Sequence, residues 1–95
     1  MPAYIVVDAN VHDPEAFKAY AEKVGATLKA HGGKPIASST DTESLEGTWD
    51  PARVVLLEFP DADAARGWYN SPEYQEIIPL RQVAATDSLV LVPGL

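Results

Sequence analysis

The chain has 95 residues, which is enough for one domain and too few for two. With 46% hydrophobic and 22% charged residues, it has the composition of a folded protein rather than of a disordered one. The absence of cysteine excludes disulfides, thiolate metal sites and a cysteine nucleophile. The net charge of −7 argues against a nucleic-acid partner, whose phosphates attract lysine and arginine.

Neither a membrane span nor a secretory leader is expected. Unbroken apolar runs, such as Val54 to Leu57, are far shorter than the roughly 20 residues of a membrane helix. The chain enters strand-like residues almost at once, without a basic and apolar leader. There is no glycine-rich phosphate loop and no zinc-type histidine spacing, so we expect no metal or other cofactor. We therefore expect a cytoplasmic protein made of a single domain, residues 1–95.

The first third of the chain predicts a strand followed by an amphipathic helix. Residues 3–9 (AYIVVDA) are β-branched and typical of a strand. Asp13 is a good N-cap and Pro14 suits the first helical position. Apolar residues then recur at helical spacing, at Phe17, Tyr20, Ala21, Val24 and Leu28. Gly25 interrupts this helix, and we expect it to mark a close packing contact.

The rest of the chain predicts three strands and two short helices. The weak strand 34–40 is followed by a turn-rich loop, and the strongest strand comes next at 52–59. One helix begins after Asp61 and a second begins at Ser71-Pro72. Residues 87–94 (DSLVLVPG) form the last strand.

The order β-α-β-β-α-β is the signature of a ferredoxin-like α+β sandwich. Right-handed crossovers place the strands at 3–9 and 52–59 side by side in the middle of the sheet, and we expect them to be parallel. The two weaker strands should lie at the edges.

Side chains of these strands are apolar on both faces of the sheet, although the helices can cover only one face. The other face keeps Val6, Val54, Leu56 and one apolar pair of the last strand. Each of these side chains left in water forgoes a burial free energy of roughly 1.5–3 kcal/mol. We therefore predict a homodimer in which the open sheet faces pack against each other.

The segment EGTWDPARVVLLEFPDADAARGWYNSPEYQEIIPLR, residues 46–81, resembles the domain-of-unknown-function family DUF1330, within the dimeric α+β barrel superfamily. The segments AYIVVDANVHDPEAFKAY, residues 3–20, and HGGKPI, residues 31–36, extend the likeness over nearly the whole chain. The resemblance implies a dimeric α+β barrel and no particular activity. Relatives often carry an arginine and a glycine where this chain has residues 38–40 (SST), so an anion site built on that arginine is not implied here.

Three residues are candidates for acid–base chemistry. Glu58 follows four apolar residues at the end of the strongest strand, where a carboxylate must be solvated or paired. Asp8 ends the neighbouring strand, so we expect the two carboxylates to approach each other and one to serve as a general acid. His12, four residues later, would exchange protons with Asp8. The alternative is that Asp8 and Glu58 both lie at the solvated mouth of the sheet, or that Glu58 pairs with Arg53 or Arg81. For His12 the alternative is a surface residue beside the helix start.

The stretch WYNSPEYQEIIPLR, Trp68 to Arg81, supplies most candidates for ligand binding. Arg81, and Arg53 before the strongest strand, can each hold a carboxylate, either a ligand's or one of the protein's own. Tyr74 and Trp68 offer aromatic surface, although such side chains also pack the joint between two helices and a sheet. We interpret the stretch as mainly a joint in which Trp68 packs, with Tyr74 and Arg81 as pocket residues.

Two functions remain open from the sequence. The first is binding of a small anionic or aromatic molecule in a cleft between sheet and helices, with cofactor-free acid–base or oxygenase-like chemistry. In this case Glu58 acts as acid or base, and Arg53, Tyr74 and Arg81 orient the ligand. The second is a non-catalytic homodimer that binds a ligand or a protein. A cavity in which Glu58 meets arginine and tyrosine would favour the first.

Overall fold

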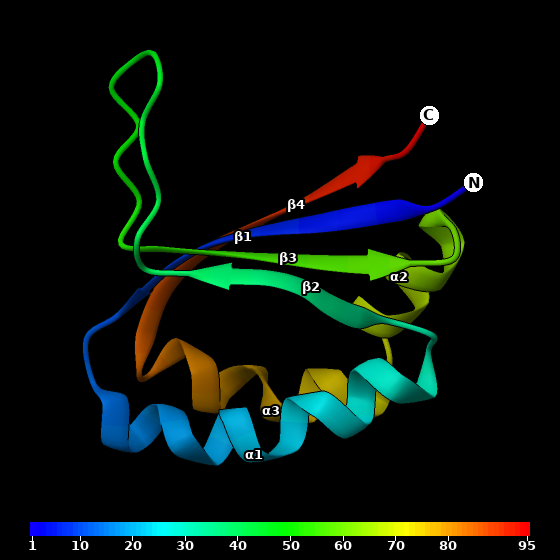
Figure 1. Cartoon of the computed structure of the whole chain (residues 1–95). Coiled ribbons are helices and arrows are strands. Elements are labelled where there is room, and N and C mark those ends of the chain that lie inside the picture. The colour runs from blue at the N-terminus through cyan, green and yellow to red at the C-terminus, as the bar shows by residue number, and fades with distance from the viewer.

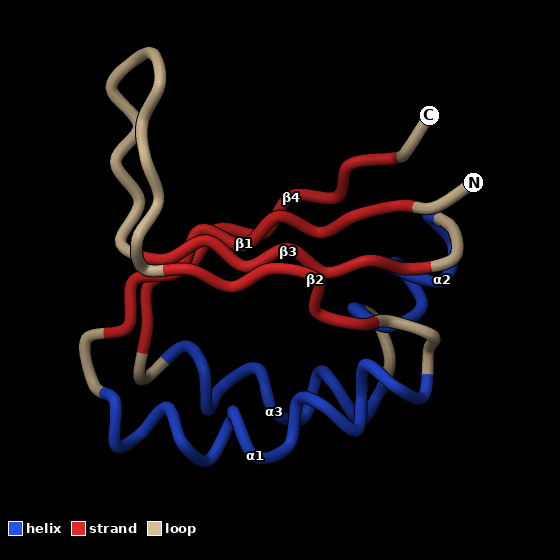
Figure 2. The backbone as a smooth tube through the Cα atoms, viewed as in Figure 1, coloured by secondary structure: helices blue, strands red, loops and turns tan.

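In the computed structural model, which describes residues 1–95, four strands form one sheet and three helices lie against one of its faces (Figures 1 and 2). This confirms the predicted α+β, ferredoxin-like order. None of the helices has the length and apolar character that crossing a membrane requires. The elements are β1 (Ala3–Val11), α1 (Pro14–Ala30), β2 (Lys34–Ser39), β3 (Arg53–Phe59), α2 (Ala62–Tyr69), α3 (Pro72–Gln82) and β4 (Ala85–Pro93).

The sheet has the strand order β2-β3-β1-β4, with β1 and β3 in the middle and the weaker strands at the edges, as predicted. The predicted parallel direction of β1 and β3 is wrong, because the two strands are antiparallel. The crossover through α1 returns the chain to β2 rather than to β3. β3 then runs back antiparallel to β2 and fills the place between β2 and β1.

The core lies between the helix layer and the alternate side chains of β1 and β3. Ile5, Val7, Leu57 and Phe59 are buried on this face of the sheet. The most completely buried large side chains are Trp68, Tyr74 and Phe59. The ring centroid of Trp68 lies 4.0 Å from that of Tyr74 and 5.5 Å from that of Phe59. The prediction that Trp68 is a packing residue is therefore confirmed.

Side-chain caps begin the helices where the sequence predicted. The carboxylate of Asp13 accepts from the backbone N–H of Ala16 at 3.1 Å, and that of Asp61 accepts from Ala64 at 2.7 Å. The hydroxyl of Ser71 accepts from the N–H of Tyr74 at 3.2 Å. Such caps each contribute about 1 kcal/mol.

The two glycines Gly33, just after α1, and Gly25, within α1, lie in different surroundings. At Gly33 a Cβ atom would lie only 2.4 Å from the ring of Phe59, so the close approach of backbone and ring requires glycine. At Gly25 nothing lies within 4 Å of the corresponding position. The expected close packing at Gly25 is therefore wrong, because this residue faces open space.

The other face of the sheet has no helix over it (Figure 1). Leu56, Val6 and Val90 are in register on β3, β1 and β4 and form an apolar row across its middle. Val90 is 57% exposed. The loop between β2 and β3 rises on this side of the sheet, and the indole nitrogen of Trp49 in this loop donates to Oδ2 of Asp8 at 3.1 Å.

Candidate ligand-binding cleft

A cavity of about 660 Å³ lies between α1 and the sheet. Its walls are mainly apolar and include Phe17, Val24, Leu28, Val7, Val55 and Leu57. A cavity of this size and character is typical of a site for a small organic molecule. We call it the α1 cleft.

The α1 cleft exists because β2 offers little to fill it. Pro35 and Ser38 are the β2 residues in the cleft wall, and both are small. The register of β2 shifts between Pro35 and Ala37, and the large side chain in between, Ile36, is 47% exposed. The helix-facing side of this edge strand therefore leaves a space under α1.

A group of polar side chains lies along the cleft. Tyr20, Arg81 and Asp87 contribute to its wall, and Tyr74 lies behind Tyr20 with no exposed surface. The hydroxyls of Tyr20 and Tyr74 are 3.0 Å apart and hydrogen-bonded. Nη1 of Arg81 lies 3.4 Å from Oδ2 of Asp87, whose other oxygen accepts from the backbone N–H of Asn10 at 3.3 Å. We call Tyr20, Tyr74, Arg81 and Asp87 the polar array.

Burial stabilises the neutral, protonated form of the two phenols. Burial, reinforced by the neighbouring Tyr74, raises the pKa of Tyr20 far above its ordinary value. Burial also raises the pKa of Tyr74, although the hydrogen bond with Tyr20 and the charge of Arg81 partly oppose it. Both hydroxyls therefore keep their protons at neutral pH and can donate hydrogen bonds.

Arg81 keeps its charge despite being buried. Burial alone lowers its pKa, but Tyr74, Tyr20 and Asp87 outweigh this effect and the pKa is raised. The array thus combines the ion pair of Arg81 and Asp87 with two neutral hydroxyls. Such a set can hold an oxygen atom of a ligand, above all an anionic one.

The arginines predicted to bind a ligand both contribute to the cleft. Arg53 lies in its wall, and Nη1 of Arg53 donates to the hydroxyl of Ser38 at 3.1 Å. Trp68 also contributes to the wall, whereas Tyr74 reaches the cleft only through Tyr20. The structure therefore brings Arg53, Arg81 and Trp68 together around one cavity.

The predicted acids lie elsewhere. In the antiparallel register Asp8 is opposite Val54 and Glu58 is opposite Tyr4, so the expected approach of the two carboxylates is wrong. Both lie on the open face of the sheet, where Glu58 pairs with Lys34 at 3.5 Å rather than with an arginine.

His12 is exposed in the turn before α1 and is not part of the cleft wall. Its catalytic role, like those of Asp8 and Glu58, stays a prediction.

Tyr20 and Asp87 are the site residues that the sequence reasoning missed. Tyr20 occurs in the apolar stripe of α1, so its pattern predicts only a core residue. Asp87 lies near the start of a strand, where an acidic residue is usually exposed, yet its side chain is only 2% exposed. The one available signal is the alternation of β4, which places Asp87 on the same face as Leu89 and Leu91.

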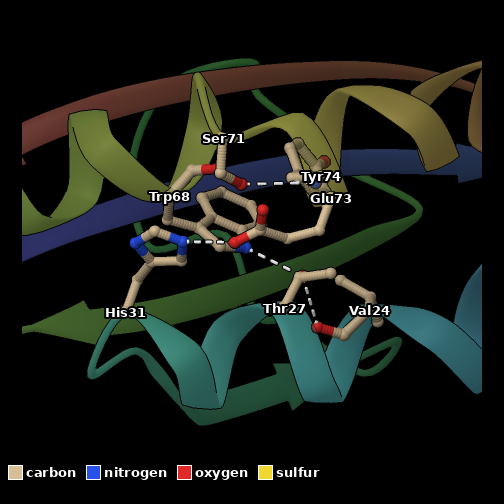
Figure 3. A network of polar contacts seen from close by, with 7 residues as sticks. All are labelled: Val24, Thr27, His31, Trp68, Ser71, Glu73 and Tyr74. Carbon is tan, nitrogen blue, oxygen red and sulfur yellow. Dashed lines mark hydrogen bonds and ion pairs between the residues drawn. The ribbon is translucent and has the colours of Figure 1, made fainter.

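A network of polar contacts fixes α1 to the other helices (Figure 3). Nε1 of Trp68 donates to the hydroxyl of Thr27 at 3.0 Å, and this hydroxyl donates to the carbonyl of Val24 at 2.7 Å. At the end of α1, Nε2 of His31 lies 2.7 Å from a carboxylate oxygen of Glu73, and this contact lowers the pKa of Glu73. No three histidine, aspartate or glutamate side chains come together as metal ligands would.

Comparison with known proteins agrees with the fold. None of the curated proteins matches the chain. Among solved structures, a protein of unknown function from Rhodopseudomonas palustris superposes with a TM-score of 0.75 at 24% identity, over 99% of this chain and 82% of that chain. SnoaB, a cofactor-independent oxygenase from Streptomyces nogalater, superposes with a TM-score of 0.70 at 18% identity, over 99% of this chain and 93% of SnoaB.

A dabb family protein with a ferredoxin-like fold from Mesorhizobium loti gives a TM-score of 0.66 at 14% identity, over 99% of this chain and 97% of that chain. These likenesses establish the fold. The model of one family, "Domain of unknown function (DUF1330)", matches residues 2–95. The chain therefore belongs to the DUF1330 family.

Proposed function

We propose that the protein is a homodimer in which each chain binds a small, mainly apolar organic molecule in the α1 cleft. The observation that carries this proposal is the combination of a cavity of about 660 Å³ with apolar walls and the polar array along one side. Apolar walls provide binding energy, and a few placed polar groups orient a ligand. Tyr20 and Arg81 are the groups that would meet a ligand's oxygen.

Binding without turnover is the form of this function that the cleft favours. A general base at neutral pH is most often an imidazole or a free carboxylate within reach of the ligand. The one carboxylate of the cleft wall belongs to Asp87, which is engaged with Arg81 and Asn10. No histidine contributes to the wall.

Cofactor-free chemistry is the second candidate, and the hydroxyl of Tyr20 favours it. Because Tyr20 keeps its proton, it could donate to an oxygen that becomes negative during a reaction. SnoaB, described as a cofactor-independent oxygenase, has the same fold. A shared fold does not transfer an activity, so this candidate depends on Tyr20 and Arg81 alone.

The homodimer is supported by the open face of the sheet. Its middle is apolar along the row Leu56, Val6 and Val90, and its ends carry polar residues such as Glu58 and Asp8. An apolar centre with a polar rim is the usual composition of a protein–protein interface. A second copy of the same face, related by a two-fold axis, covers it most simply.

Filling the cleft from α1 tests the binding proposal. Ala21 is exposed and contributes to the cleft wall, whereas Ala26 is exposed on the same helix and does not. With the neutral dye Nile red as probe, we expect the wild type and Ala26→Phe to bind alike. Ala21→Phe should bind roughly tenfold more weakly, a loss of about 1.4 kcal/mol. Equal binding by all three proteins, or by none, would overturn the proposal.

A further inference from the structure

Arg81 is a buried cation with too few partners inside the protein. Its side chain is 8% exposed, and that of Asp87 is 2% exposed. A guanidinium has five N–H donors and normally meets a carboxylate through two of them at about 2.7–2.9 Å. Here the contact of Nη1 with Asp87 is 3.4 Å long, and the buried Nε has no hydrogen-bond partner. Burying a charged group without partners is costly. The guanidinium of Arg81 therefore lacks a hydrogen-bond acceptor that such a buried charge normally has.

The buried Nε is closed to a ligand, but Arg81 contributes to cavity walls, where a ligand can supply an acceptor to its terminal nitrogens. Arg81 and Asp87 contribute to the wall of the α1 cleft and also to that of a second cavity, of about 560 Å³, beside α2 and β4. The ion pair therefore lies between two spaces rather than in solid core. On the side of the α1 cleft, the hydroxyl of Tyr20 is a further donor.

The charge of the cleft agrees with an acidic ligand. Its wall contains two guanidinium groups, Arg53 and Arg81, against the single carboxylate of Asp87. The wall is thus positive within a chain of net charge −7. Because the molecule as a whole repels anions, a positive wall around an apolar space indicates selection of an anionic group there.

We propose that the ligand of the α1 cleft is an apolar carboxylic acid whose carboxylate binds Arg81. This inference rests on the proposed ligand-binding function and adds the ligand's chemical class. A carboxylate matches the planar fork of a guanidinium. It brings only one negative charge beside Asp87, whereas a doubly charged phosphate would cost more to remove from water. The apolar body of the acid then lies along Phe17, Val24 and Leu28.

Two isosteric probes test this assignment by isothermal titration calorimetry. Naphthalene-2-carboxylate carries the charge, and naphthalene-2-carboxamide has the same shape without it. We expect the carboxylate to bind the wild type about tenfold more tightly, because hydrogen bonds to charged groups are the stronger ones.

The variants locate the carboxylate. In Arg81→Met/Asp87→Asn, which removes both charges so that neither is left buried alone, the carboxylate's affinity should fall to that of the carboxamide. Arg81→Lys keeps the charge without the planar fork and should retain part of the preference. If circular dichroism shows that the double variant is unfolded, Arg81→Lys still tests the assignment.

The outcomes separate this inference from the function on which it rests. If neither probe binds the wild type although Nile red binds in the α1 cleft, the cleft proposal stands and this inference fails; if Nile red does not bind either, both fail. If both bind equally, the cleft stands and the assignment of Arg81 is wrong. A preference that disappears in Arg53→Met but persists in the Arg81 variants would place the carboxylate at Arg53 and overturn the assignment. Loss of the preference in Arg81→Met/Asp87→Asn and a reduced preference in Arg81→Lys, with Arg53→Met behaving like the wild type, support it.

Discussion

The indole nitrogen of Trp68 donates a hydrogen bond to the hydroxyl of Thr27 across 3.0 Å, so that α2 is tied to α1 inside the core (Figure 3). Thr27 is buried, and its own hydrogen goes to the carbonyl of Val24. Trp68 and Val24 both contribute to the α1 cleft. The bond therefore fixes the position of α1, which forms one wall of the cleft, relative to α2.

Replacing Thr27 by valine should destabilise the fold more than replacing it by serine. Valine keeps the shape but leaves the buried N–H of Trp68 without an acceptor, which costs about 1–3 kcal/mol. Serine keeps the hydroxyl and loses one methyl group, about 0.8 kcal/mol. Urea unfolding measures both free energies. A valine variant at least as stable as the serine variant would show that the bond contributes little.

Stability should fall at high pH because Tyr20 and Tyr74 are buried as neutral phenols. Burial, with the effect of Tyr74, raises the pKa of Tyr20, and burial raises that of Tyr74. In the unfolded chain both phenols ionise near pH 10, so above about pH 10 the native state holds protons that the unfolded state has released. The free energy of unfolding is therefore maintained below about pH 9 and decreases as the pH rises further.

The variant Tyr20→Phe tests whether the buried phenols cause this loss of stability at high pH. It removes one of the two raised pKa values, so the decrease between about pH 9 and 11 should be shallower than in the wild type. Urea unfolding at several pH values gives these slopes. Identical slopes in Tyr20→Phe and the wild type would contradict the prediction.

Two glycine-to-alanine substitutions should have opposite effects. In Gly33→Ala the new Cβ would lie 2.4 Å from the ring of Phe59, which is 1% exposed and packed against Trp68, so the ring has no room to move. Overpacking of this kind costs about 1–3 kcal/mol. In Gly25→Ala the methyl group meets nothing within 4 Å, and alanine favours the helix by about 1 kcal/mol. Thermal unfolding compares the two, and a stabilised Gly33→Ala would refute the close contact.

The sequence predicted those parts of the structure that depend on local rules. Asp13, Asp61 and Ser71 cap helices because each needs only a backbone N–H three residues ahead. Alternation along β1 and β3 identified the buried and the open face of the sheet. The predicted direction of β3 relative to β1 was wrong. This direction depends on the strand to which the crossover returns, and the alternation of side chains does not encode it.

The candidate site depends on contacts that no local pattern contains. Tyr20 and Tyr74 are 54 residues apart and meet only when α1 packs against α3. The cleft itself results from side chains that are too small, at Pro35 and Ser38, so it is a property of the assembled shape. Arg53 and Arg81 were predicted for their chemistry, but only the fold shows that the cleft wall contains both of them and not Glu58.

The open face of the sheet predicts that the wild type is a dimer and that Val90→Lys is a monomer. Val90 is 57% exposed in the single chain, so a lysine there leaves the monomer's core intact. In a two-fold dimer it would place a charge in the apolar row formed with Val6 and Leu56, where no water remains to solvate it. The matched control is Val83→Lys, because Val83 is 66% exposed at the end of α3, in the helix layer.

Sedimentation equilibrium at micromolar concentration measures the mass of each protein. The wild type and Val83→Lys should show twice the chain mass of 10.2 kDa, and Val90→Lys should show the chain mass itself. A circular dichroism spectrum of Val90→Lys that matches that of the wild type would show that its fold is intact, although loss of the partner should lower its Tm. A wild type that sediments as a single chain would mean that this apolar row is left in water, and the homodimer would have to be abandoned.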